Sequence, residues 1–280
     1  MSDVATTPVT VIGGGIMGSG IAYVAAISGH PVTIVEVSDA AADAARGHVT
    51  KYATRARDRG DDLGTVDAVT YTTDLAAGVG TASIVVEAVI EDLEVKRELF
   101  GRLGAAASPG TLLASNTSGL SIEVIGAASG HPAETIGLHF FNPVPSMKLV
   151  EMIAAPDTSA ESVARGRAFC EGLGKQTIIV RDLPGFTTTR LGVALMAEAI
   201  RTFEQGVASA ADIDTGMKLG YNHPMGPLEL ADRIGLDTLL NILENQREAW
   251  GEGFRPPPLL RQMVAAGKLG RKSGRGFYGY

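Results

Sequence analysis

The sequence has a single cysteine, Cys170, among its 280 residues, so it forms no disulfide within the chain and no cysteine-based zinc site. It contains no apolar run long enough to cross a bilayer, and its first residues lack the basic and apolar segments of a signal peptide. The 24 basic and 31 acidic residues give a net charge of −7, which disfavours nucleic acid or an anionic membrane as a partner. We therefore expect a cytoplasmic protein that binds neither.

Histidines and hydrolase motifs are scarce too. The five histidines show no metal-ligand spacing such as H-E-x-x-H, so we expect no metal site. A G-x-S-x-G elbow is absent, which disfavours a Ser-His-acid hydrolase. The sequence surroundings of four histidines are typical of surface or turn positions: His30, His48, His131 and His223.

A glycine-rich turn joins the first expected strand to the first expected helix. Gly13, Gly15 and Gly18 have the spacing G-x-G-x-x-G, which permits a tight turn, a close approach of a pyrophosphate, and close packing of helix on strand. The helix N-terminus supplies N–H groups and a positive end for phosphates. Glu36 ends the next strand, where a carboxylate binds ribose hydroxyls and repels the 2′-phosphate of NADP. The pattern predicts an NAD site, with a merely structural turn as the alternative.

Strand-like and helix-like runs alternate through residue 184. This alternation predicts an α/β fold with a Rossmann-type, doubly wound and mostly parallel sheet. Strands are expected at residues 9–12, 31–37, 69–73, 84–90, 111–115, 135–140, 149–154 and 177–180. The longer helices expected between them cover residues 16–27, 39–59 and 92–103.

The pattern changes at Pro184-Gly185, a dipeptide that marks a turn. Beyond it, only helix-like runs follow, at residues 189–204, 210–219, 227–250 and 258–266. We therefore expect an NAD-binding domain of residues 1–184 and a smaller, all-helical domain of residues 185–280. The helical domain has more apolar faces than so few residues can bury, so we expect it to form a homodimer and to line the substrate cleft.

His139 is the strongest candidate for a catalytic group. It ends an expected strand, and Glu151 lies twelve residues later in the next apolar run. A carboxylate in an apolar strand is costly without a partner, which a histidine on the neighbouring strand would supply. Such a pair fixes the imidazole tautomer and suits a general base. The alternative is a structural histidine and a separately satisfied glutamate.

Two further sites are open to more than one interpretation. Ser118 follows an expected strand, so its hydroxyl is placed either to bond a substrate oxygen or to cap a local turn. Lys51 and Arg55 lie four residues apart and share a helix face. That face either binds the phosphates of a nucleotide-bearing substrate or is simply solvated.

Six long blocks span most of the chain: VIGGGIMGSGIA, VVEAVIEDLEVKRELF, LLASNTSGLSI, IGLHFFNPVPSMKLVEMI, ASAADIDTGMKLGYNHPMGPLELADRIGLD and GRKSGRGFYGY. They resemble the 3-hydroxyacyl-CoA dehydrogenases, above all the short bacterial 3-hydroxybutyryl-CoA dehydrogenases. The resemblance implies NAD-dependent oxidation of a short-chain L-3-hydroxyacyl-CoA thioester to the 3-ketoacyl-CoA, or the reverse reduction, by a dimer.

The resemblance also implies roles for single residues. His139 would take the proton of the 3-hydroxyl, Glu151 would orient His139, and Ser118 would bond the substrate oxygen. Lys51 and Arg55 fall where the family places positive charge for the CoA phosphates. The implied cofactor contacts are Gly13, Gly15, Ile16, Met17, Gly18, Glu36, Glu91, Lys96, Ser118 and Asn142.

One active-site position departs from the family. The family has asparagine in GF-x-x-N-R, whereas this chain reads GFTTTR with Thr189 there. Losing one donor near a developing oxyanion costs about two to three orders of magnitude in rate. Three alternatives follow: a slower enzyme, the same chemistry on a carrier-protein-bound or free 3-hydroxy acid, and a non-catalytic NAD-binding protein.

Overall fold

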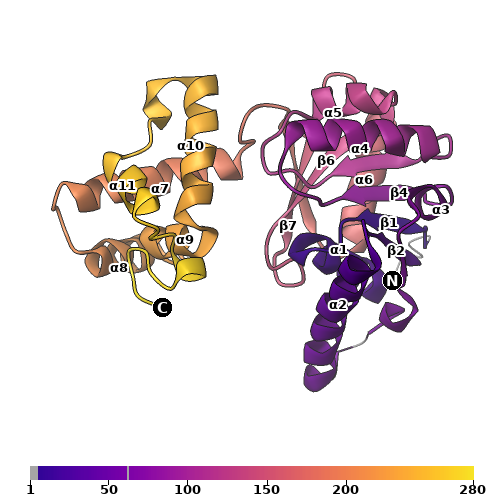
Figure 1. Cartoon of the computed structure of the whole chain (residues 1–280), viewed down its shortest axis with the longest axis horizontal. Coiled ribbons are helices and arrows are strands. Elements are labelled where there is room, and N and C mark those ends of the chain that lie inside the picture. Colours follow the sequence, from indigo (N-terminus) through magenta and orange to yellow (C-terminus); the bar gives the residue numbers. More distant parts are fainter. Residues whose placement is uncertain (1–5, 62) are drawn as a thin grey trace. The chain divides into compact units, whose positions relative to one another are not determined.

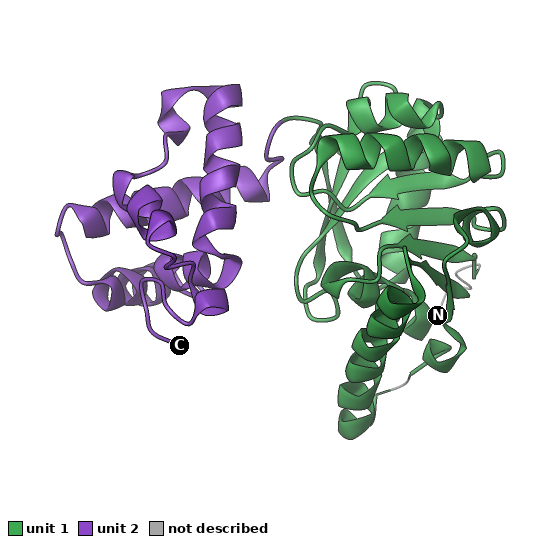
Figure 2. Ribbon diagram, in the orientation of Figure 1, with its two compact units in different colours: residues 1–183 green, residues 184–280 purple. Residues whose placement is uncertain are grey.

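The computed structural model describes residues 6–61 and 63–280. It contains two compact units, Met1–Leu183 and Pro184–Tyr280, which Figure 2 shows in green and purple. Each unit has an apolar cluster of its own, so each one has the core of an independent domain.

Unit 1 is built on an eight-stranded sheet with the strand order β3-β2-β1-β4-β5-β6-β7-β8. Every neighbouring pair is parallel except β6 and β7, which are antiparallel. The expected Rossmann-type, mostly parallel sheet is therefore confirmed. The strands are β1 (Val9–Ile12), β2 (Val32–Val35), β3 (Thr70–Thr72), β4 (Ile84–Glu87), β5 (Leu112–Ser115), β6 (Thr135–Phe140), β7 (Leu149–Ala154) and β8 (Gln176–Arg181).

Helices cover both faces of this sheet. The helices of unit 1 are α1 (Ile16–Ile27), α2 (Asp39–Arg59), α3 (Leu75–Val79), α4 (Leu93–Ala106), α5 (Ile122–Ser129) and α6 (Ala160–Gly172). Residues of α1, α2 and α6 share one apolar cluster with alternate residues of the strands, while α4 packs against α3 and α5 (Figure 1). Val85, Leu113 and Ile153 point to the opposite face of the sheet and are also buried.

His30 lies directly after a turn, as one of the two expected settings requires, but it is buried and not on the surface. It follows the turn after α1 and is 2% exposed. Its ring lies 5.6 Å from that of Phe169 on α6, and its Nδ1 lies 3.0 Å from the carbonyl oxygen of Thr7.

Cys170, also on α6, is fully buried, and this burial raises the pKa of its thiol to about 12.

Unit 2 is helical, with a core formed by residues of several helices. Its helices are α7 (Thr188–Glu204), α8 (Ala210–Gly220), α9 (Pro227–Ile234), α10 (Leu236–Trp250) and α11 (Pro258–Ala265). The expected single helix at residues 227–250 is wrong. It is divided at Gly235, whose φ of +104° lies in the region that only glycine adopts easily, so the chain turns there between α9 and α10.

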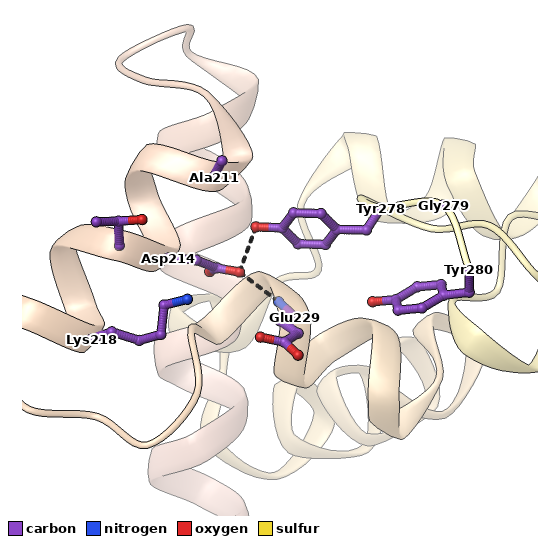
Figure 3. A pocket seen from close by; sticks show the side chains of 8 residues that line it. Ala211, Asp214, Lys218, Glu229, Tyr278, Gly279 and Tyr280 are labelled. Atoms are coloured by element: carbon purple, nitrogen blue, oxygen red, sulfur yellow. Dashed lines mark hydrogen bonds between the residues drawn. The ribbon is translucent and has the colours of Figure 1, made fainter.

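The C-terminal residues are attached to unit 2 through two buried aspartates. Asp214 on α8 accepts hydrogen bonds from the backbone N–H groups of Leu228 (2.8 Å) and Glu229 (2.9 Å) and from the Tyr278 hydroxyl (2.7 Å), as Figure 3 shows in part. Asp232 on α9 accepts from the backbone N–H of Tyr278 (2.9 Å). Asp214 therefore caps α9 and holds the C-terminal segment at the same time.

This arrangement predicts an alkaline loss of stability that Tyr278→Phe removes. Burial, followed by the hydrogen bond to the Asp214 carboxylate, raises the pKa of Tyr278. Because the pKa of Tyr278 is higher in the folded state than in the unfolded state, the protonated hydroxyl contributes fully to the free energy of unfolding below the unfolded pKa of about 10. That contribution is lost as the pH rises above this value. We expect Tyr278→Phe to lose about 1 kcal/mol of unfolding free energy at neutral pH, and to lose less stability than the wild type on going to high pH.

Thermal unfolding from about pH 7 to pH 11 measures both effects. Tyr221→Phe is the matched control, because Tyr221 is 75% exposed on the same unit. Parallel pH profiles for wild type and Tyr278→Phe would contradict the role of the Tyr278–Asp214 bond.

Candidate active site

The glycine-rich turn lies between β1 and α1. Gly13 has φ +89°, and its N–H donates to the carbonyl oxygen of Val35 at 3.0 Å. A Cβ atom on Gly18 would collide with the carbonyl oxygen of Gly13, whereas one on Gly15 would meet no atom within 4 Å. The turn is therefore closely packed at Gly18 and open at Gly15. The open side lies at the N-terminus of α1, which fits the approach of a pyrophosphate.

Glu36 is bonded to this turn. It follows β2, and its Oε1 accepts the Gly14 N–H at 2.5 Å while its Oε2 accepts the Val37 N–H at 3.1 Å. Ile16 and Met17 open α1 beside the turn, with Ile16 59% exposed. Because β1 pairs with β2 on one side and with β4 on the other, the turn lies where the strand order reverses, which is the usual place for a dinucleotide in such a sheet.

His139 and Glu151 form a hydrogen-bonded pair. They lie directly opposite each other in the antiparallel strands β6 and β7, and His139 Nδ1 is 2.8 Å from Glu151 Oε2. Glu151 is completely buried and His139 is 8% exposed, with its ring centroid 4.5 Å from that of Phe141. The carboxylate fixes the Nδ1–H tautomer, which makes Nε2 the basic nitrogen of the neutral ring.

Glu91 and Ser118 also meet. Glu91 lies in the loop after β4, and its Oε1 accepts bonds from the Ser118 hydroxyl (3.0 Å), the Ser118 N–H (2.8 Å) and the Thr117 hydroxyl (2.7 Å). Lys96 Nζ lies 3.6 Å from Glu91 Oε2, but the Lys96 side chain is only 1% exposed. Because β4, β5 and β6 are parallel neighbours, Glu91, Ser118 and His139 all lie at the carboxyl edge of the sheet.

The other predicted site residues lie in other segments of the chain. Asn142 is exposed, and its bond to Pro143 is cis. Lys51 and Arg55 lie on exposed positions of α2. Thr189 belongs to unit 2, as the second residue of α7, and is half-buried.

Other polar residues at the carboxyl edge of the sheet were not predicted from the sequence. Glu87 ends β4 fully buried and accepts a bond from the Ser115 hydroxyl at 2.6 Å. Asn116 accepts the Phe140 N–H at 2.9 Å and so links the ends of β5 and β6. For Glu87 a signal exists, since a carboxylate in the apolar run IVVE needs a partner just as Glu151 does.

Neither a metal site nor a membrane span is found in the part of the chain that the structure describes. Among these residues, no group of three or more His, Cys, Asp or Glu side chains is arranged to hold a metal ion. No described helix is both long and apolar enough to cross a membrane.

Comparison with known proteins places both units in one family. Residues 8–183 match the 3-hydroxyacyl-CoA dehydrogenase, NAD binding domain, and residues 185–280 match the 3-hydroxyacyl-CoA dehydrogenase, C-terminal domain. The 3-hydroxybutyryl-CoA dehydrogenase of Mycobacterium tuberculosis is 43% identical, with complete coverage of both chains. The mitochondrial hydroxyacyl-coenzyme A dehydrogenase of Homo sapiens is 44% identical over 97% of this chain and 90% of its own.

Among solved structures, the (S)-3-hydroxybutyryl-CoA dehydrogenase of Ralstonia eutropha is similar with a TM-score of 0.94. It is 38% identical in sequence, and the match covers 99% of each chain. The glycine turn and the His139–Glu151 pair lie within the region that matches the NAD binding domain of this family, and the second match covers unit 2. The chain therefore belongs to the 3-hydroxyacyl-CoA dehydrogenase family.

Proposed function

We propose that this protein is an NAD-dependent dehydrogenase that interconverts a short-chain L-3-hydroxyacyl-CoA, such as 3-hydroxybutyryl-CoA, and the 3-ketoacyl-CoA. The observation that carries the proposal is the 2.8 Å bond between His139 and Glu151 at the carboxyl edge of a sheet whose first turn fits a dinucleotide. Relatives named for this activity and similar over nearly the whole chain support it.

In this proposal His139 is the general base. Its Nε2 takes the proton of the substrate 3-hydroxyl, and Glu151 stabilises the imidazolium that results. Ser118 donates to the substrate oxygen, and bound NAD⁺ supplies the acceptor for the hydride of C3. In the reverse direction His139 returns the proton to the oxygen, so one residue serves both directions.

The direct test follows NADH absorbance with acetoacetyl-CoA as substrate and free acetoacetate as control. We expect rapid, saturable NADH oxidation with the thioester and little with the free acid. Binding of NADH without turnover of any 3-keto thioester or 3-keto acid would contradict the proposal and favour a non-catalytic NAD-binding protein.

A second candidate is the same chemistry on a carrier-protein-bound or free 3-hydroxy acid. Thr189 favours it, because a hydroxyl replaces the amide donor of the family. Slow wild-type turnover of acetoacetyl-CoA that Thr189→Asn accelerates would support this candidate. Fast wild-type turnover, with little change in Thr189→Asn, would contradict it.

Glu36 is proposed to set the preference for NAD over NADP. We expect Glu36→Gln to weaken NAD⁺ binding by about tenfold, because it loses a charged acceptor of the ribose hydroxyls. The same change removes the repulsion of a 2′-phosphate, so the ratio of NADP⁺ to NAD⁺ affinity rises. Titration calorimetry with both cofactors measures the ratio, and an unchanged ratio would contradict the role.

The finer features of substrate binding and assembly are proposed as follows. Lys51 and Arg55 bind the CoA phosphates, and unit 2 lines the substrate cleft and forms a homodimer in the cytoplasm. Exposed apolar side chains of unit 2, among them Leu191 at 66%, Val207 at 68% and Leu219 at 83%, support the dimer. Light scattering on the full chain tests it: a monomer at micromolar concentration would contradict it.

A further inference from the structure

A buried ion pair lies at the base of the two loops that carry Glu91 and Ser118. Glu87 is the last residue of β4, and Lys96 lies in the first turns of α4. Lys96 Nζ is 2.5 Å from Glu87 Oε1, and the two side chains are 1% and 0% exposed. Burying two charges costs more desolvation free energy than a surface pair would, and well-packed apolar residues often replace such pairs without loss of stability. Stability alone therefore gives no reason for charges at these positions.

Each partner makes further bonds that connect the loops. Glu87 Oε2 accepts the Ser115 hydroxyl at the end of β5 (2.6 Å), and Glu87 Oε1 accepts the N–H of Val89 (2.7 Å). The ammonium of Lys96 extends from Glu87 toward Glu91 Oε2, 3.6 Å away. The pair thus links the ends of two strands to the carboxylate of Glu91.

Glu91 in turn holds Ser118 through hydrogen bonds. One oxygen faces Lys96, which leaves Oε1 to accept the Ser118 hydroxyl and the Ser118 N–H. Because the backbone N–H is held as well as the hydroxyl, the position of Ser118 persists when the hydroxyl turns toward a substrate oxygen. A displacement of about 1 Å at such a group is enough to lower the rate strongly.

We propose that Glu87 and Lys96 are positioning residues, which hold the Glu91 carboxylate and, through it, the Ser118 hydroxyl in place for the reaction. Neither needs to touch substrate, since both are buried beneath the loops. The inference deepens the proposed function and rests on the role of Ser118 in it. It also gives Lys96, which the family resemblance implies to be a cofactor contact, a role in holding the loop.

The test uses the double variant Glu87→Gln/Lys96→Met, which removes both charges and keeps the side-chain sizes. Because no charge is left buried alone, we expect an unfolding temperature equal to or above that of wild type. We expect kcat with acetoacetyl-CoA, measured at saturating NADH, to fall by about tenfold or more. Arg97→Met is the matched control on the same helix: Arg97 is an exposed partner of Glu94, so kcat should not change.

A double-mutant cycle with Glu91→Gln separates positioning from general damage. If the pair acts through Glu91, then Glu91→Gln alone lowers kcat, and adding Glu87→Gln/Lys96→Met to it lowers kcat little further. The proposal would be overturned if the fold-decreases in kcat of the separate variants multiplied fully in the combined variant. An unchanged kcat in Glu91→Gln, or in the folded double variant, would overturn it as well. The Glu91→Gln result keeps the test decisive even if the double variant does not fold.

A crystal structure of the Glu87→Gln/Lys96→Met variant gives a readout that needs no turnover. We expect the 3.0 Å bond between Ser118 Oγ and Glu91 Oε1 to be broken or lengthened. A bond that is retained would overturn the proposal, and loss of NADH binding instead would show that the pair supports the cofactor site. Inactivity of the wild type on all substrates contradicts the proposed function alone, because this structural readout does not depend on it.

Discussion

His139→Gln is expected to lower kcat for acetoacetyl-CoA reduction by about two to four orders of magnitude, the usual contribution of a general acid–base group. The glutamine side chain has a similar reach but neither takes nor gives a proton near neutral pH. Its amide can still donate to the buried Glu151 carboxylate, which now lies 2.8 Å from His139 Nδ1. Glutamine is therefore a better test than alanine, which would remove that donor and cost stability.

Two measurements make the interpretation of His139→Gln specific. The unfolding temperature and the NADH dissociation constant should stay close to those of wild type, because the glycine turn and Glu36 follow other strands, β1 and β2. Glu151→Gln is the companion variant and should lower kcat by a smaller factor, since it keeps the base but removes the carboxylate that stabilises its charged form. Unchanged turnover in His139→Gln would eliminate His139 as the base.

The parts of the site that are local in sequence could be predicted. The glycine turn needs only the spacing of Gly13, Gly15 and Gly18 between an apolar strand and a helix. The His139–Glu151 pair could be anticipated because both lie in consecutive apolar strands and a buried carboxylate requires a partner. Their antiparallel pairing, which places them directly opposite each other, is a property of the folded sheet that the spacing alone does not determine.

The parts that depend on packing between distant segments could not be predicted in the same way. Lys96 lies in a charged helix whose pattern indicates solvent, yet it is 1% exposed because Glu87 on β4 lies against that helix. His30 has the sequence of a turn residue, and its burial comes from α6, more than a hundred residues later. The break at Gly235, by contrast, had a local signal, since glycine inside a helical pattern often marks a helix end.

Gly18→Ala is expected to impair both folding and cofactor binding. The added Cβ would collide with the backbone carbonyl of Gly13 and lie 3.2 Å from a methyl group of Val11. Neither atom belongs to a flexible side-chain end, so α1 must move away from β1 or the turn must open. Overpacking of this kind costs about 1–3 kcal/mol of unfolding free energy. Displacement of the α1 N–H groups from the pyrophosphate should weaken NADH binding by about a hundredfold or more.

Gly15→Ala provides the matched comparison, because a Cβ on Gly15 would meet no protein atom within 4 Å and its φ of −63° suits alanine. We expect this variant to unfold at the wild-type temperature or above it, while its methyl group occupies the space that the pyrophosphate needs and weakens NADH binding. Thermal unfolding and NADH fluorescence titration on the two variants separate the roles of the two glycines. Wild-type stability in Gly18→Ala would contradict the close packing of α1 on the turn, and wild-type NADH affinity in Gly15→Ala would place the pyrophosphate elsewhere. If both expectations hold, two functions of this short turn, packing a helix and admitting a ligand, belong to different residues three positions apart.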